Sequence, residues 1–395
     1  METGNKQNFD DIRPFHDSEV PSAIGSLINN FYFRRAVEPL LKPITWEMFS
    51  GSMLSCKSVY DFQRTIIYPF MKQLIAKTTS ELTGIGFEEF KGGSGHLFIS
   101  NHRDIVLDAA FLNILFFDKG INTSEIAIGD NLLIYPWITD LVRLNKSFIV
   151  KRGVSVREML DTSKHLSEYI YDTITRRNQS IWIAQREGRA KDSDDKTQTS
   201  LLKMLTLYNS SKPAEALRSL NIVPLSITYE FDPCDYLKAR EYQLKRDNPG
   251  YKKSQADDIE NMQTGILGYK GKVFFKFGNR INENLSAVDA NANRTEILEI
   301  ATKAIDAEIY KNYVFFPINY IAYDLMENSD SFAGQYTEED KLFFNNYIDG
   351  QIAKIKIPDK DYGFLRKKLI EMYGNTVKNF VSAQKAQAEG EKAKG

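Results

Sequence analysis

Short apolar segments alternate with helical stretches through the middle of the chain, from about residue 96 onward. These segments, which are rich in β-branched and aromatic residues, are His96–Ser100, Glu125–Gly129, Ser147–Val150, Ser180–Ala184, Asn221–Thr228 and Lys272–Phe277. Strands that alternate with helices are typical of a sheet with helices packed on its faces. The pattern predicts an α/β fold with a central mixed, largely parallel sheet flanked by helices, and with extra helical segments at both termini.

Helix signals divide the chain into regions. Residues 1–90 are predicted to be a helical N-terminal region, with helices over Ser22–Leu41 and Asp61–Leu82. An α/β domain follows at 91–316, where capping boxes at Ser155–Glu158 and Asn293–Glu296 start two helices. Within it, 235–270 is predicted to be an exposed basic insertion. Residues 317–383 form a helical C-terminal region, and 384–395 a disordered tail.

Composition excludes several classes of protein. The chain has 51 Lys+Arg against 52 Asp+Glu, which argues against a protein built wholly around nucleic acid. Two distant cysteines, Cys56 and Cys234, provide neither a disulfide framework nor a cysteine zinc cage, so a reducing compartment is favoured. No apolar run reaches the roughly 18 residues of a membrane span, and the polar start does not resemble a secretory signal. We expect a cytoplasmic protein with no metal site.

One of the four histidines has a setting that favours chemistry. His102 directly follows the apolar run Leu97–Ser100 and precedes a predicted helix over Asp108–Phe117. The carboxyl end of a strand is where open α/β sheets place ligand sites. Asp104 or Asp108 could hold one ring nitrogen protonated and leave the other free as a base. The alternative is a helix-capping turn with a solvent-facing histidine.

Charged residues follow the next strands in the same way. Gln185–Lys191 contains Glu187, Gly188 and a group of cations that could bind anionic groups, namely Arg186, Arg189 and Lys191. Lys151 and Arg152 end another strand. The alternative for these residues is a solvated turn with surface ion pairs. Pro224 lies inside the run Ile222–Ile227 and demotes it to an edge strand or a bulge, unless its missing N–H faces outward.

These four segments, in this order, resemble the four sequence blocks of the glycerolipid acyltransferase superfamily, which includes glycerol-3-phosphate and 1-acylglycerol-3-phosphate acyltransferases. The blocks are Ser100–Asp108, Phe148–Lys151, Glu187–Ala190 and Val223-Pro224, and the resemblance covers roughly residues 90 to 230. Two positions depart from the common pattern. Five residues separate His102 from Asp108 instead of four, and Ala190 stands where an arginine is usual. As a whole the chain is most similar to a bacterial branch with long extra helices at both ends.

The resemblance implies transfer of a fatty acyl group from an acyl thioester to a hydroxyl of a glycerophosphate, a lysophospholipid or a related amphiphile. The thioester would be carried on CoA or on acyl carrier protein, as a co-substrate, and no cofactor is implied. His102 would be the general base, with Asp108 or Asp104 as its partner. Glu187 and Gly188 would position the acceptor. The residues that would neutralise anionic groups are Lys151, Arg152, Arg189 and Lys191.

An amphiphilic acceptor predicts work at a membrane surface, peripherally at the inner face. Ser22–Leu41 could be an interfacial amphipathic helix, or it could dock on the main domain. The basic stretch Tyr236–Lys253 could contact anionic lipid or receive an acidic carrier protein. Two other functions remain open: a non-catalytic lipid- or acyl-carrier-binding protein on a degenerate scaffold, and a hydrolase that transfers the acyl group to water.

Overall fold

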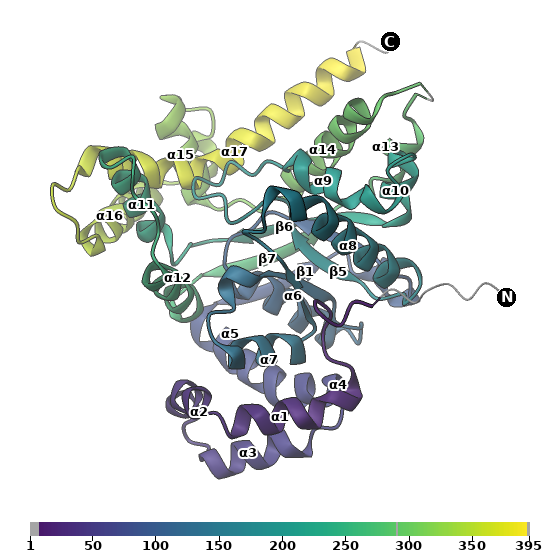
Figure 1. The fold of residues 1–395 in the computed structure, drawn as a ribbon. Helices are drawn as coiled ribbons and strands as arrows, with labels where there is room; N and C mark the ends of the chain where they lie inside the picture. Colours follow the sequence, from purple (N-terminus) through teal and green to yellow (C-terminus); the bar gives the residue numbers. More distant parts are fainter. Residues whose placement is uncertain (1–7, 290, 393–395) are drawn as a thin grey trace.

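The computed structural model describes residues 8–289 and 291–392 (Figure 1). In these residues a seven-stranded sheet has the order β1-β7-β6-β2-β5-β3-β4. Its strands are β1 (Glu81–Ile85), β2 (Leu97–Ser100), β3 (Glu125–Gly129), β4 (Ser147–Val150), β5 (Ile181–Ala184), β6 (Ile222–Tyr229) and β7 (Lys272–Phe277). Neighbouring strands are parallel except for the antiparallel pair β6–β7. The predicted fold class, α/β with a mixed and largely parallel sheet, is confirmed.

Helices cover both faces of the sheet. One face packs against α8 (Val156–Thr175), α9 (Thr199–Leu205), α10 (Pro213–Ser219), α13 (Asn282–Ser286) and α14 (Arg294–Lys311), and the other against α5 (Tyr68–Thr78) and α6 (Leu107–Asp118). The side chains of β2 alternate between the layers, because Leu97 and Ile99 join the first core and Phe98 joins the second. Both predicted capping boxes are present, at the starts of α8 and α14.

The N-terminal helices form a separate small core at one end of the molecule (Figure 1). They are α1 (Val20–Ile28), α2 (Phe31–Val37), α3 (Trp46–Ser55) and α4 (Val59–Phe62), and they pack on α7 (Pro136–Leu144). The predicted continuous helix over Ser22–Leu41 is wrong, because Asn30 is extended and its side chain caps α2 by accepting a hydrogen bond from the Phe33 N–H at 3.0 Å. Within the predicted helical region 1–90, one strand is also present, since β1 pairs with β7.

Helices from the second half of the chain pack beside the sheet on the other side of the molecule. They are α11 (Asp235–Asp247), α12 (Gln255–Leu267), α15 (Pro317–Glu327), α16 (Glu338–Lys354) and α17 (Tyr362–Lys392). Short 3-10 helices lie at Asp17–Glu19, Glu38–Leu40, Glu88–Gly92, Asp130–Leu132, Leu207–Asn209 and Ala333–Gln335, and a π-helical turn at Gln63–Ile67 links α4 to α5.

The predicted disordered tail is wrong as far as the structure describes it. Residues 384–392 continue α17 as a helix, whereas 393–395 lie outside the described residues. The tail is rich in alanine, glutamine, lysine and glutamate, which are strong helix formers. A polar composition therefore extends an existing helix here, although it would not build a core of its own.

The predicted exposed basic insertion is also corrected. Lys238 is 1% exposed and bonds to Asp232, and Arg240 forms ion pairs with Asp257 and Glu260. Acidic residues that lie nearby in space thus neutralise much of this stretch. The hypothesis that Tyr236–Lys253 is an open basic surface for lipid or a carrier protein loses its basis.

Pro224 lies in a central strand, because β6 is flanked by β2 and β7. Its carbonyl accepts a hydrogen bond of 2.8 Å from the Gly278 N–H, just after the end of β7 at Phe277. The N–H and C=O of one strand residue point the same way. The missing donor therefore faces outward, past the end of the ladder, so the exception allowed for this run applies and β6 is neither an edge strand nor a bulge.

Candidate active site

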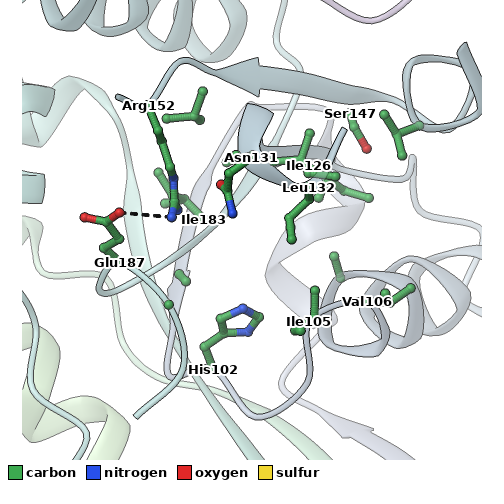
Figure 2. Close-up of a pocket in the computed structure, with 18 of the residues that line it drawn as sticks. His102, Ile105, Val106, Ile126, Asn131, Leu132, Ser147, Arg152, Ile183 and Glu187 are labelled. Carbon is green, nitrogen blue, oxygen red and sulfur yellow. Dashed lines mark hydrogen bonds and ion pairs between the residues drawn. The ribbon is translucent and has the colours of Figure 1, made fainter. Parts of the chain in front are cut away.

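A cavity of about 1020 Å³ opens at the carboxyl ends of the parallel strands. It is lined by all the sequence-predicted residues except the two aspartates: His102, Lys151, Arg152, Glu187, Gly188, Arg189 and Lys191. In Figure 2 His102 points into this space, with Ile105 and Val106 to one side and the Arg152–Glu187 pair to the other. The structure thus brings together segments that are far apart in the sequence.

The imidazole of His102 is held by Asp108. The distance from His102 Nδ1 to Asp108 Oδ2 is 2.8 Å, and the same oxygen accepts hydrogen bonds from the backbone N–H groups of Arg103 (2.6 Å) and Asp104 (3.1 Å). Asp108 is fully buried at the start of α6. Because a carboxylate accepts the Nδ1 proton, the lone pair of Nε2 is left for a ligand in the cavity.

Asp104 has a different place from Asp108. Its Oδ1 accepts hydrogen bonds from the N–H groups of Val106 (2.9 Å) and Leu107 (2.8 Å), so it fixes the turn that opens α6. Burial, followed by the neighbouring charge of Asp108, raises the pKa of Asp104. Of the two carboxylates that the sequence left open, Asp108 contacts the ring and Asp104 supports the turn.

Buried polar contacts fix the backbone on either side of His102. The side-chain amide of Asn101 bonds to both the N–H and the C=O of Ile227, each at 2.8 Å, and ties the end of β2 to β6. Arg103 makes a bidentate ion pair with Asp195 (3.0 and 2.5 Å), which also accepts the Tyr313 hydroxyl at 2.6 Å. Burial opposes the charged form of Arg103, but Asp195 outweighs it and raises the pKa of the guanidinium. These contacts fix the backbone of the turn that carries His102.

Trp182 of β5 forms a further part of the site. Its indole N–H donates to Ser100 Oγ at 3.0 Å, and its ring meets the His102 ring nearly edge-on, with centroids 5.7 Å apart. Sequence reasoning missed Trp182, Asp195 and Tyr313. Trp182 lies in a strand that looks purely structural, and the other two belong to no motif and lie far from His102 in the sequence.

The remaining histidines lie in other settings. His96 is buried between Phe90 and Phe98, where burial and then the charge of Arg280 lower its pKa to about 4. His165 Nε2 lies 3.0 Å from an oxygen of Asp11. Neither of these two imidazoles lines the cavity.

The predicted cations form a rim, and most of them are paired with acids. Lys151 bonds to Asp11 (2.6 Å), Arg152 to Glu187 (3.0 Å) and Lys191 to Glu241. Arg189 differs, because its Nη2 donates to the side-chain amide oxygen of Asn261 at 2.9 Å. The turn that carries these residues depends on Gly188, whose φ of 69° favours glycine.

Comparison with known proteins gives the class of the domain. Residues 82–228 match the family model described as Acyltransferase, and these residues include all four sequence blocks. No curated protein matches the chain. A solved structure, the 1-acyl-sn-glycerophosphate (LPA) acyltransferase PlsC from Thermotoga maritima, aligns with 12% identity over 75% of this chain and 96% of its own, with a TM-score of 0.35.

Residues 82–228 therefore form an acyltransferase domain. The match spans the stretch that holds the four sequence blocks, and it confirms that this part of the chain is similar to acyltransferases.

Proposed function

We propose that this protein transfers a fatty acyl group from a thioester of CoA or acyl carrier protein to a hydroxyl of a glycerophosphate, a lysophospholipid or a related amphiphile. The observation that supports this most is the pair of His102 and Asp108 at a cavity with two kinds of wall. One wall is apolar and suits an acyl chain; its members include Phe70, Met71, Ile105, Val106, Ala109, Ile138, Leu141 and Val142. The other carries the cationic rim and suits an anionic headgroup.

In the proposed reaction, His102 Nε2 takes the proton of the acceptor hydroxyl. At the same time the hydroxyl oxygen forms a bond to the carbonyl carbon of the thioester. Asp108 stabilises the imidazolium that forms. The carbon–sulfur bond then breaks, and the departing thiolate takes the proton, so that His102 returns to its neutral form. The acyl group passes directly between the two substrates, and no acyl-enzyme is formed.

The test is an assay of the purified protein with acyl-CoA and acyl carrier protein thioesters, against a panel of acceptors. We expect thiol release that depends on the acceptor, with one ester formed for each thiol. Free fatty acid formed without an acceptor would instead show a hydrolase. Lipid binding without thioester consumption, across the whole panel, would show a binding protein on an acyltransferase scaffold.

We also propose that the N-terminal helices bring the cavity to a membrane surface. No described helix is both long and apolar enough to cross a bilayer. Ile24 and Phe33 are buried in the small core that the N-terminal helices form with α7, whereas Phe31 and Tyr32 of α2 are 68% and 64% exposed. Tyr32 also stacks on Tyr135, directly before α7, and α7 lines the cavity. Exposed aromatic rings next to an apolar cavity suit insertion among lipid headgroups.

Replacing Phe31 and Tyr32 together by serine is expected to weaken binding to phospholipid vesicles by about tenfold or more, since each buried aromatic ring contributes about 1.5–3 kcal/mol. Vesicle sedimentation measures this. The matched control replaces Leu342 and Phe343 of α16, which are also adjacent and exposed, and should leave binding unchanged. Equal losses in both double variants would contradict the assignment of α2 to the membrane.

A further inference from the structure

Helix α12 forms a wall of the cavity, although it lies outside the matched acyltransferase domain. Its Asp258 and Met262 line the cavity, as does Lys253 just before it. The helix also packs closely on the turn behind His102. A Cβ atom added at Gly265 would come 1.9 Å from Asp104 Oδ2, so only glycine allows this approach.

Within this wall, Asn261 contacts Arg189. Asn261 is 5% exposed, and its Oδ1 accepts the hydrogen bond from Arg189 Nη2 while its Nδ2 donates to the Asp257 carbonyl at 2.8 Å. The backbone carbonyl oxygen of Asn261 accepts a hydrogen bond from the Cys234 thiol at 3.3 Å. The amide is therefore fixed on both sides and holds one arm of the guanidinium.

In this arrangement no carboxylate forms an ion pair with Arg189 in the part of the chain that the structure describes. Lys151, Arg152 and Lys191 each bond to a carboxylate, but the partner of Arg189 is a neutral amide. Its Nη1 is buried and has no hydrogen-bond partner within 8–289 and 291–392. A half-buried guanidinium at the cavity wall with an unused N–H donor favours an anionic ligand.

The acids near Arg189 do not remove this charge. Asp104 and Asp232 lie close enough to be influenced by it. Asp232 already bonds to Lys238, and the pKa of Asp104 is raised, chiefly by burial, which favours its neutral form. Lys270 is fully buried near Asp104 and Asp232, and burial lowers its pKa to about 8.

We propose that Asn261 is a positioning residue that holds Arg189 for a phosphate group of a substrate bound in the cavity. This inference rests on the proposed function, and it assigns a role in specificity to a helix outside the matched domain. The phosphate could belong to the acyl acceptor or to the CoA of the donor. Both sources require the same chemistry, a guanidinium whose charge is not already neutralised by a carboxylate.

The test uses binding rather than turnover, so that it is independent of the proposed reaction. Isothermal titration calorimetry of the full chain would compare glycerol 3-phosphate with glycerol, and CoA with pantetheine. Asn261→Asp keeps the size of the side chain but gives Arg189 a carboxylate partner. We expect this variant to weaken binding of the phosphate-bearing probe by about tenfold or more, because the salt bridge competes with the ligand.

Two further variants make the result specific. Gln263→Glu introduces the same charge on an exposed position of α12 and should leave binding unchanged. Arg189→Gln should weaken binding of the phosphate-bearing probe, as Asn261→Asp does, but it introduces no new buried charge. A loss for glycerol 3-phosphate alone assigns the site to the acceptor, and a loss for CoA alone assigns it to the donor.

The proposal is overturned if Asn261→Asp and Arg189→Gln bind both phosphate probes as the wild type does, or if glycerol and pantetheine bind as tightly as their phosphorylated counterparts. Wild-type protein that binds a phosphate probe but transfers no acyl group would contradict the proposed function alone. If the wild-type protein does transfer acyl groups, its steady-state kinetics provide a further test. Asn261→Asp should raise the KM of the phosphate-bearing substrate and leave kcat within about twofold.

Discussion

Replacing His102 by glutamine is expected to lower kcat for acyl transfer by about 10³-fold, with little change in KM. Glutamine fills similar space but cannot take a proton, and positioned general bases contribute about 10²–10⁴-fold to rates. Steady-state kinetics of the purified variant, folded as judged by its circular dichroism spectrum and Tm, provide the measurement.

The two aspartates behind His102 provide the control for this prediction. Asp108→Asn should lower kcat by about 10²-fold or more, because it removes the charge that stabilises the imidazolium 2.8 Å away. Asp104→Asn should have a much smaller effect, since an amide oxygen can still accept the N–H groups that Asp104 accepts at the start of α6. If Asp104→Asn were the more damaging of the two, the assignment of Asp108 as the partner of His102 would be wrong.

The second large effect concerns stability. Asp195→Asn should lower the free energy of unfolding by about 3–5 kcal/mol, because it leaves the buried charge of Arg103 without its carboxylate. Urea denaturation measures the loss. Activity should fall as well, since Arg103 directly follows His102 in the chain.

Two comparisons make the stability prediction specific. Asp349→Asn breaks an exposed ion pair with Arg366, and it should change the free energy of unfolding by less than about 1 kcal/mol. The double replacement of Arg103 by methionine and Asp195 by leucine removes both buried charges and should recover much of the stability. An Asp195→Asn protein as stable as the wild type would show that this pair does not secure the turn.

The sequence predicts the strands and the placement of most candidate side chains because both follow from local patterns. The apolar run Leu97–Ser100 is buried on both faces, and polar residues that follow parallel strands must meet at one edge of the sheet. His102 and Glu187 therefore reach the same cavity, although they lie 85 positions apart in the sequence (187 − 102).

Contacts between distant segments could not be predicted in the same way. Asp195, Tyr313 and Asn261 have no motif around them, and their partners are fixed only when the helices pack. The charge of the basic stretch in α11 could not be predicted either. Acids of α12 and of the loop before α11 neutralise it, and the sequence alone does not show that they lie beside it. The choice between Asp104 and Asp108 likewise needs the geometry of the turn.

Direct acyl transfer with His102 as the base is tested by a single-turnover experiment with a radiolabelled acyl thioester, excess enzyme and a lysophosphatidate acceptor. Quenched samples would be divided into thioester, acylated acceptor, free fatty acid and protein-bound label. We expect label to reach the acceptor at the rate of thiol release, with none on the protein and almost no transfer by His102→Gln. Label bound covalently to the protein, or transfer by His102→Gln at the wild-type rate, would contradict this expectation.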